Sequence, residues 1–292
     1  VPLSAVYSAS WLFRGLRLWK ILAMQGLRKG FLDALSLELV SDLANQFVPA
    51  RLGDAVKVVY LKRRDGFGLA EGVFSAVLVR VLDLAALLSL SGLCLLMLPA
   101  GSTGAGHMAA VSGAASLAVI SMAALVFWLR PSLLAGLLGG PLRRLREPVL
   151  RVRNGIKGTG MAFPGLFMIS CSIWVFDVMT LLIFLEALGV SLSPFETAFV
   201  LFAANLAKAV PFSPNGLGVY EGAAVLLLTS FGTPRATAFA VSVLDHAFMN
   251  LFSAALSMAA LARLGLSAGD LTGLASASSR EPETGGPPRE SP

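Results

Sequence analysis

The chain has 292 residues, of which 56% are hydrophobic and only 14% are charged, and its mean hydropathy is +0.77. A soluble globular domain carries about 25% charged residues, so this composition excludes an ordinary soluble domain. Non-alternating apolar runs of about 20 residues favour membrane-spanning helices over a β-barrel. The net charge of +6 is typical of basic loops that orient a membrane protein, so nucleic-acid binding is not expected.

The apolar runs predict an all-α, polytopic membrane protein with about five spanning helices and two helical hairpins that are each broken in the middle. The predicted spans are Pro2–Leu27, Leu69–Leu98, Met108–Leu129, Gly165–Leu188 and Ala236–Leu264. The predicted hairpins are Phe31–Leu61 and Pro194–Phe231. In the first span, Arg14, Arg17 and Lys20 are spaced by three residues, which places them along one helix face.

The first hairpin is broken between Asn45 and Asp54. Pro49 ends the inward helix, Arg51 lies at the tip, and Gly53 precedes Asp54 at the start of the returning helix. A broken backbone survives at membrane depth only where protein or a water-filled cavity surrounds it. Helix N-termini attract phosphate, and an arginine can bind phosphate oxygens bidentately. Asp54 is either a first-turn cap or a group that acts on substrate or protons.

The second hairpin is broken by a segment with proline, glycine and then a carboxylate. Gly216 and Gly218 allow close approach of the backbone, and Asn215 tolerates the left-handed region. Glu221 occupies the position that corresponds to Asp54. We expect the nearby lysine, Lys208, to extend toward the outer interface.

Further ionisable groups interrupt the predicted spans and imply a polar cavity, because charged groups are costly in lipid and should face the protein interior. Arg80 and Asp83 are three residues apart on one helix face and could pair. His246 follows Asp245 in the last span and is either a packing histidine or a proton carrier. The remaining polar groups are Glu38, Asp42 and Asn45 on one face of the first half-helix, and Asp177 and Glu186 in the fourth span.

Lysine and arginine in short loops predict the orientation. The segment 130–157 carries seven basic residues and one acid, so we expect it on the cytoplasmic side, as we do Arg28-Lys29 and Lys62-Arg63-Arg64. The order span, hairpin, span then occurs twice with opposite orientation, which is an inverted repeat of the kind that carriers use. We expect residues 1–265 to form the membrane domain and residues 266–292 a disordered cytoplasmic tail.

Motifs of enzymes and metal sites are missing from the sequence. It contains no HExxH, GxSxG or Walker motif, and Cys94 and Cys171 suggest neither a disulfide framework nor a metal site. We therefore expect no cofactor and no catalytic activity.

The two breaks resemble motifs of the lysylphosphatidylglycerol synthase transmembrane domain family, also called the flippase-like domain family. The first family motif is matched by Asn45, Pro49-Ala50-Arg51, Gly53-Asp54 and Lys57, followed by Arg80 and Asp83. The second is matched by Pro214, Gly216-Leu217-Gly218 and Glu221, with Asn215 in place of a glycine. The family usually has an arginine in the last span, where this chain has Leu244-Asp245-His246, and we expect no aminoacyl-transfer domain after that span.

This resemblance implies a translocase that moves a phospholipid or polyprenyl-phosphate-linked lipid between the leaflets of the cell membrane. The alternatives are a carrier for a small anionic solute, or a non-transporting partner of a lipid-modifying enzyme or glycosyltransferase. The candidate substrate-binding residues are Asn45, Arg51, Gly53, Asp54, Arg80, Asp83, Asn215, Gly216, Gly218, Glu221, Asp245 and His246.

Replacing Arg51 with alanine should abolish lipid transport and leave folding and membrane insertion intact, because the guanidinium is expected to bind the lipid phosphate. Leaflet exchange of fluorescent phospholipids in proteoliposomes measures the effect. Unchanged lipid movement in the Arg51→Ala variant would count against a site at this tip.

Overall fold

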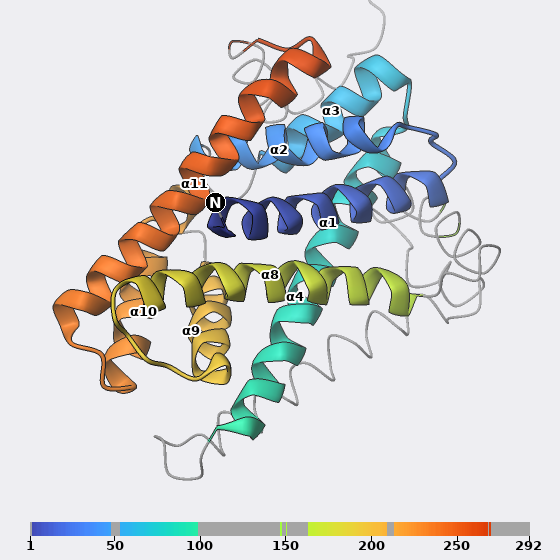
Figure 1. Cartoon of the computed structure of the whole chain (residues 1–292). Helices are drawn as coiled ribbons and strands as arrows, with labels where there is room; N and C mark the ends of the chain where they lie inside the picture. Colours follow the sequence, from blue (N-terminus) through green and yellow to red (C-terminus); the bar gives the residue numbers. More distant parts are fainter. Residues whose placement is uncertain are drawn as a thin grey trace, which may run out of the picture.

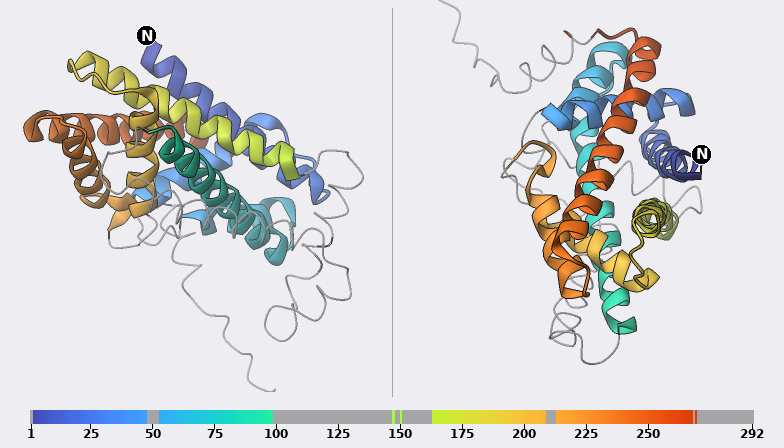
Figure 2. Two further views of the ribbon diagram at one scale, coloured as in Figure 1. Left: turned by 90° about the horizontal axis from the view of Figure 1, so that it is seen from below. Right: turned by 60° about the vertical axis from the view of Figure 1, so that its left-hand side comes forward.

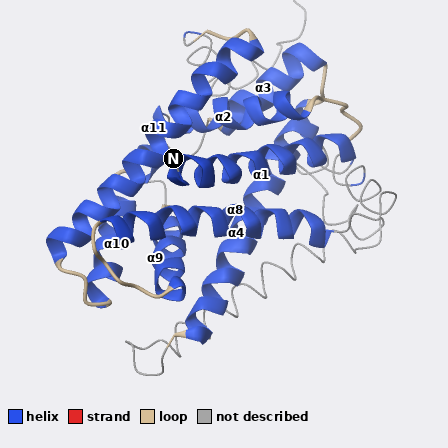
Figure 3. Cartoon of the chain, in the orientation of Figure 1, coloured by secondary structure: helices blue, strands red, loops and turns tan. Residues whose placement is uncertain are grey.

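The computed structural model describes residues 2–47, 53–98, 147, 150, 163–208, 213–267 and 269, and within these residues the fold is entirely helical (Figures 1 and 3). The helices are α1 (Pro2–Met24), α2 (Phe31–Phe47), α3 (Asp54–Asp65), α4 (Leu69–Met97), α8 (Phe163–Ala187), α9 (Pro194–Ala207), the 3₁₀ turn η3 (Pro214–Gly216), α10 (Val219–Ser230) and α11 (Arg235–Leu264). The all-α prediction is therefore confirmed for this part of the chain.

Among the described residues, three helices are long and apolar enough to cross a membrane, namely Leu69–Leu95 within α4, Pro164–Ala187 within α8, and α11. The shorter α9 is also apolar. The predicted first span forms α1, but Arg14, Arg17 and Lys20 make it less apolar than those three. The predicted span Met108–Leu129, nearly all of the basic segment 130–157, and most of the predicted tail lie outside the described residues.

Local sequence signals set the helix ends. Ser193 caps α9 through its hydroxyl, which accepts from the Glu196 N–H, while the Glu196 carboxylate accepts from the Ser193 N–H; Pro194 occupies the first turn. Gly66 ends α3 in the left-handed conformation, with φ of 62°. These caps satisfy backbone groups that the helices leave unpaired.

Two long helices join the two ends of the molecule. In Figure 1, α11 runs from α10 to α2, and α4 runs from α3 to α9. α1 and α8 lie side by side between these ends, as both views in Figure 2 also show. Because α4 and α11 contact both broken segments, they fix the distance between them.

Apolar side chains pack into clusters at either end. One cluster joins α4 and α8 to α11, and it includes Trp174, Phe202 and Leu228 from α8, α9 and α10. Another joins α1, α2 and α3 to the other end of α11, through side chains such as Leu37 and Leu261. Burying each large apolar side chain contributes about 1.5–3 kcal/mol, so each break is held by a core of its own.

Many large apolar side chains remain exposed along the outer faces of the helices. Leu226 on α10 and Leu251 on α11 are 73% and 72% exposed, and Met168 on α8 and Met258 on α11 are exposed to a similar extent. Many exposed large apolar side chains on one molecule are typical of a surface that contacts a partner or a membrane. Lipid chains would cover these faces.

Close backbone packing explains one residue of the first motif. Gly53 has ordinary helical dihedrals, with φ of −56°, so its role is not conformational freedom. A Cβ atom at this position would lie 2.7 Å from the Ser41 carbonyl oxygen and even closer to the Asn45 amide nitrogen. The glycine thus lets the start of α3 lie directly against α2.

Replacing Gly53 with alanine should destabilise the protein by about 1–3 kcal/mol, because the added methyl group forces α2 and α3 apart. Thermal unfolding in detergent measures this. Gly222→Ala in α10 is the matched control, since its Cβ would meet no atom within 4 Å. Equal unfolding temperatures for the two variants would contradict this role for Gly53.

Candidate functional site

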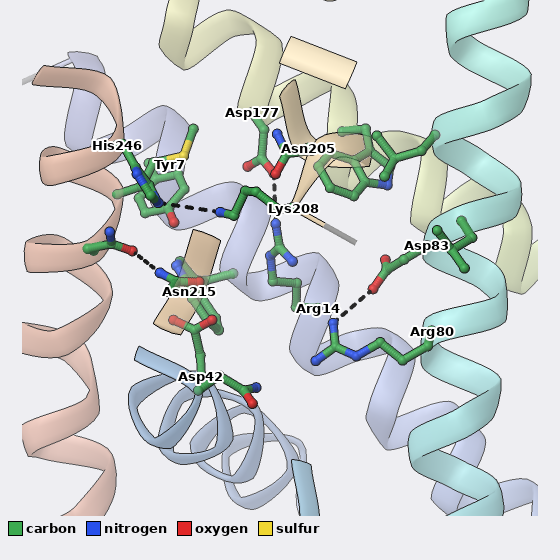
Figure 4. A pocket seen from close by; sticks show the side chains of 17 residues that line it. Tyr7, Arg14, Asp42, Arg80, Asp83, Asp177, Asn205, Lys208, Asn215 and His246 are labelled. Carbon is green, nitrogen blue, oxygen red and sulfur yellow. Dashed lines mark hydrogen bonds and ion pairs between the residues drawn. The ribbon is translucent and has the colours of Figure 1, made fainter. Parts of the chain in front are cut away.

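A polar cavity of about 250 Å³ lies between the two broken segments (Figure 4). Its walls come from α1, α2, α4, α8, α9, η3 and α11. The charged residues in its lining are Arg14, Asp42, Arg80, Asp83, Asp177 and Lys208, with His246 beside them. The aromatic and amide residues of the lining are Tyr7, Trp11, Trp174, Asn45, Asn205, Asn215 and Asn250, and Leu84, Leu87 and Met249 complete it. Three cations and three carboxylates therefore face one space.

Asp54 is bound by an arginine of the neighbouring helix α4. Arg80 donates from Nε to Asp54 Oδ2 at 2.7 Å and from Nη2 to Oδ1 at 2.8 Å, which is a bidentate pair. Ser41 and Asn45 of α2 donate to the same Oδ1, at 2.9 and 3.3 Å. The N-cap position of α3 is Gly53, and the carboxylate of Asp54, in the first turn, orients the Arg80 guanidinium.

A lysine and a glutamate extend this cluster toward α2. Lys57 Nζ lies 3.5 Å from Asp54 Oδ1 and donates to Glu38 Oε2 at 3.1 Å. Both Lys57 and Glu38 are buried. The two acidic residues predicted to share a face of the first half-helix therefore have different surroundings. Glu38 pairs with Lys57, whereas Asp42 lines the cavity.

Asp83 joins α4 to α1. Arg17 Nη1 donates to Asp83 Oδ1 at 2.5 Å and to the Ser170 hydroxyl at 2.9 Å. Arg80 and Asp83, which the sequence suggested as a pair, are 3.7 Å apart between Nη1 and Oδ2. The pair exists, but each residue has a closer partner on another helix.

A second ion pair crosses from α1 to α8. Arg14 Nη2 donates to Asp177 Oδ2 at 2.7 Å, and the guanidinium carbon lies 5.4 Å from the Trp11 ring centroid and 5.9 Å from that of Trp174. Both partners line the cavity. Arg14 was not among the predicted site residues, although its spacing from Arg17 had already placed the two on one helix face.

The backbone of the second break adopts the positive φ angles that its asparagine and glycine residues predict. Asn215, Gly216 and Gly218 have φ of 48°, 73° and 81°, all in the region that favours glycine. The Asn215 side chain donates to Asn250 Oδ1 on α11 at 2.6 Å. A Cβ atom on Gly216 would lie 2.6 Å from Lys208 Cγ. This close approach seats the lysine stem against the turn.

Lys208 lies in the cavity wall, so the expectation that it extends to the outer interface is wrong. Its Nζ is 3.4 Å from His246 Nε2, and His246 Nδ1 is 2.6 Å from Glu221 Oε1. Glu221 Oε2 also accepts from the Gly218 N–H at 2.7 Å, so Glu221 both caps α10 and holds the histidine. Behind them, the Tyr220 hydroxyl donates to Asp245 Oδ2 at 2.5 Å.

The structure therefore brings most of the predicted residues to one region, where some line the cavity and others support its walls. Asn45, Arg80, Asp83, Asn215 and His246 line the cavity. Five others support its walls, namely Gly53, Asp54, Gly216, Gly218 and Glu221. Asp245 is fully buried against Tyr220. Arg51 lies outside the described residues.

A metal centre is not evident here. Across the described residues, no group of three or more His, Cys, Asp or Glu side chains is placed to hold a metal ion. Cys94 and Cys171 are free thiols. The chemistry that this cavity offers is electrostatic binding of a polar ligand.

Comparison with known proteins gives a family match and two relatives. The family model described as the lysylphosphatidylglycerol synthase TM region matches residues 1–257. Glycosyltransferase AglD of Haloferax volcanii is 30% identical over 293 residues, which cover 85% of this chain and 46% of that protein. UPF0104 membrane protein MJ1078 of Methanocaldococcus jannaschii is 24% identical over 201 residues, which cover 68% of this chain and 85% of that protein.

These matches agree with the apolar helices in making the chain a multi-pass membrane protein. The chain spans about half the length of the glycosyltransferase, whose name describes the longer protein. No solved structure matches the sequence significantly.

Substitutions at the Arg17–Asp83 pair test how much the buried ion pairs contribute to stability. Arg17→Met should destabilise the protein by about 3–5 kcal/mol, because it removes the closest counter-charge of a buried carboxylate. The double variant Arg17→Met/Asp83→Leu should recover most of that loss, since no uncompensated carboxylate remains there. Denaturant unfolding in detergent measures both.

The exposed pair between Arg263 and Asp33 is the control, with side chains 47% and 34% exposed. Arg263→Met should cost less than about 1 kcal/mol. A double variant no more stable than Arg17→Met would show that the pair itself, and not the orphaned carboxylate, accounts for the loss.

Proposed function

Because the chain belongs to the lysylphosphatidylglycerol synthase TM region family, we propose that it is a lipid translocase. It would move a phospholipid or polyprenyl-phosphate-linked lipid between the leaflets of the membrane. The supporting observation is the polar cavity among apolar helices, where Arg14, Arg80 and Lys208 face one space. Buried charges in a membrane protein default to a role in a substrate or ion pathway.

The arginines and lysine suit a phosphate that enters the cavity. A guanidinium binds phosphate oxygens through parallel N–H bonds, and an ammonium binds phosphate as a point charge. Arg80 is 30% exposed although Asp54 holds it in a fixed orientation, so part of its guanidinium remains available to a ligand. Arg51, in the break between α2 and α3, would add a further cation.

We also propose that α2 with α3, and α9 with α10, are the two hairpins of an inverted repeat. The members of each pair pack against one another, and each pair is separated by a break that carries a family-like motif. With segment 130–157 and the C-terminal tail on the cytoplasmic side, the first hairpin would enter from the cytoplasm and the second from outside. Alternating access would then expose the cavity to each leaflet in turn.

A lipid would bind only by its head group. The cavity volume of about 250 Å³ accommodates a compact phosphate-bearing group and not two acyl chains as well. The chains would stay in the bilayer, against the exposed apolar faces of the helices. A carrier for a free anionic solute would use the same charges, so the two functions differ in whether the acyl chains are required.

A second candidate function follows from the similarity to a protein named a glycosyltransferase. The chain would then be the membrane part that presents a lipid to such an enzyme without moving it. Binding of lipid without leaflet exchange would favour this candidate over the translocase.

Replacing Arg80 with glutamine should slow leaflet exchange by about tenfold or more, because the phosphate loses a charge-assisted bidentate partner. Arg80→Lys keeps the charge but loses the planar fork, and should be intermediate. Exchange of fluorescent phosphatidylglycerol and of a fluorescent polyprenyl phosphate in proteoliposomes is the measurement.

Arg263→Gln is the control, since that arginine is exposed near the end of α11, away from the cavity. It should exchange lipid at the wild-type rate. Wild-type rates in Arg80→Gln as well, with normal insertion, would count against a head-group site in the cavity.

A further inference from the structure

With Lys208 as an ammonium group and Glu221 as a carboxylate, the contacts from Lys208 through His246 to Glu221 have one consistent arrangement of protons. An ammonium group has donors and no acceptor, so His246 Nε2 must accept from Lys208 across 3.4 Å. The remaining ring nitrogen, Nδ1, then carries the hydrogen and donates to the Glu221 carboxylate across 2.6 Å. His246 is therefore the neutral link between a cation and an anion.

A proton on His246 cannot be added without moving the lysine. Protonated Nε2 would become a donor that points at a second donor, and two positive charges would face each other at hydrogen-bonding distance. The His246 side chain is only 3% exposed, so water does not screen this repulsion well. The contact to Glu221 would persist and become an ion pair.

Lys208 can move because it lies at the end of α9 and lines the cavity. An anion in the cavity would draw its ammonium away from Nε2, which leaves that nitrogen buried without a donor. A proton would then satisfy Nε2, and the added positive charge would also favour the anion. Figure 4 shows the contact between Lys208 and His246 at the cavity wall.

Other titratable groups surround this contact. α10 contributes Glu221 and Tyr220, the end of α9 contributes Lys208, and α11 itself contributes Asp245, which is bound to Tyr220. On the cavity side lie Tyr7 of α1 and Asp177 of α8, and Asp177 is paired with Arg14. His246 joins the lysine to the carboxylate of Glu221.

We propose that His246 is a proton-binding site coupled to the anion site, so that one proton is taken up when a phosphate diester binds beside Lys208. This rests on the proposed function, and it would allow a proton gradient to drive lipid movement. Binding of the anion and of the proton each strengthens the other by the same factor. Anion affinity should therefore weaken by up to about tenfold for each unit of rising pH, while the free site is unprotonated.

Calorimetric titration of the full-length chain in detergent tests this. The probe is dihexanoyl phosphatidylglycerol, since its diester phosphate does not titrate near neutral pH, and protein-free micelles give the background. Glycerophosphoglycerol, the same head group without acyl chains, is the second probe. Repeating each titration in buffers of different ionisation enthalpy gives the number of protons taken up.

Wild-type protein should take up about one proton per bound diester. His246→Gln, which can still accept from Lys208, and His246→Asn, which keeps a donor for Glu221, should both bind with no proton uptake and with an affinity that does not change with pH. Asp33→Asn, on the exposed surface, should behave as wild type. Size-exclusion profiles and melting temperatures establish that each variant is folded.

The outcomes separate the coupling from the translocase. Binding to wild type without proton uptake, or unchanged uptake in both His246 variants, would overturn the coupling. Uptake with glycerophosphoglycerol but no binding of the lipid would support the coupling and overturn the lipid function in favour of a solute carrier. No binding of either probe would overturn both.

Discussion

Each charge buried among these helices needs a counter-charge, because neither lipid nor packed protein can solvate it. The structure meets this constraint with a continuous series of ion pairs that crosses α1, α4, α3 and α2. Its members in spatial order are Arg17, Asp83, Arg80, Asp54, Lys57 and Glu38. Each residue inside the series pairs with the residue before it and the residue after it. The relative positions of the four helices therefore depend on one set of contacts.

The two broken segments are also tied to each other through α11. Asn250 accepts from Asn215 at the second break through its side chain, and from Gln46 at the end of α2 through its backbone carbonyl, at 2.6 and 3.3 Å. Ser253, one turn further along, donates to Asp42 at 2.9 Å. These contacts connect the two breaks through α11, as the proposed alternating access would require.

The cavity is balanced in charge, and this bears on how a carrier would work. Its three cations are already near carboxylates or a histidine, so an incoming phosphate would have to share or displace these partners. Such a site would bind an anion less tightly than a cluster of unpaired cations. Moderate binding suits a carrier, because substrate must leave the site as well as enter it. Ion pairs that rearrange when the phosphate binds would also give the empty and loaded states different contacts.

Sequence patterns predicted the described helices, the two breaks and most of the polar residues that lie inside, but Glu186, which was also expected to face the interior, is exposed. Run length and the positions of proline and glycine are local signals, and the predicted starts at Leu69 and Pro194 agree with those of α4 and α9. Partner choice was decided only by the tertiary structure. Asp54 pairs with Arg80, and Lys208 faces His246, because helix rotation and the packing of Gly53 and Gly216 set which side chains meet. Spacing along one helix carries no information about those contacts.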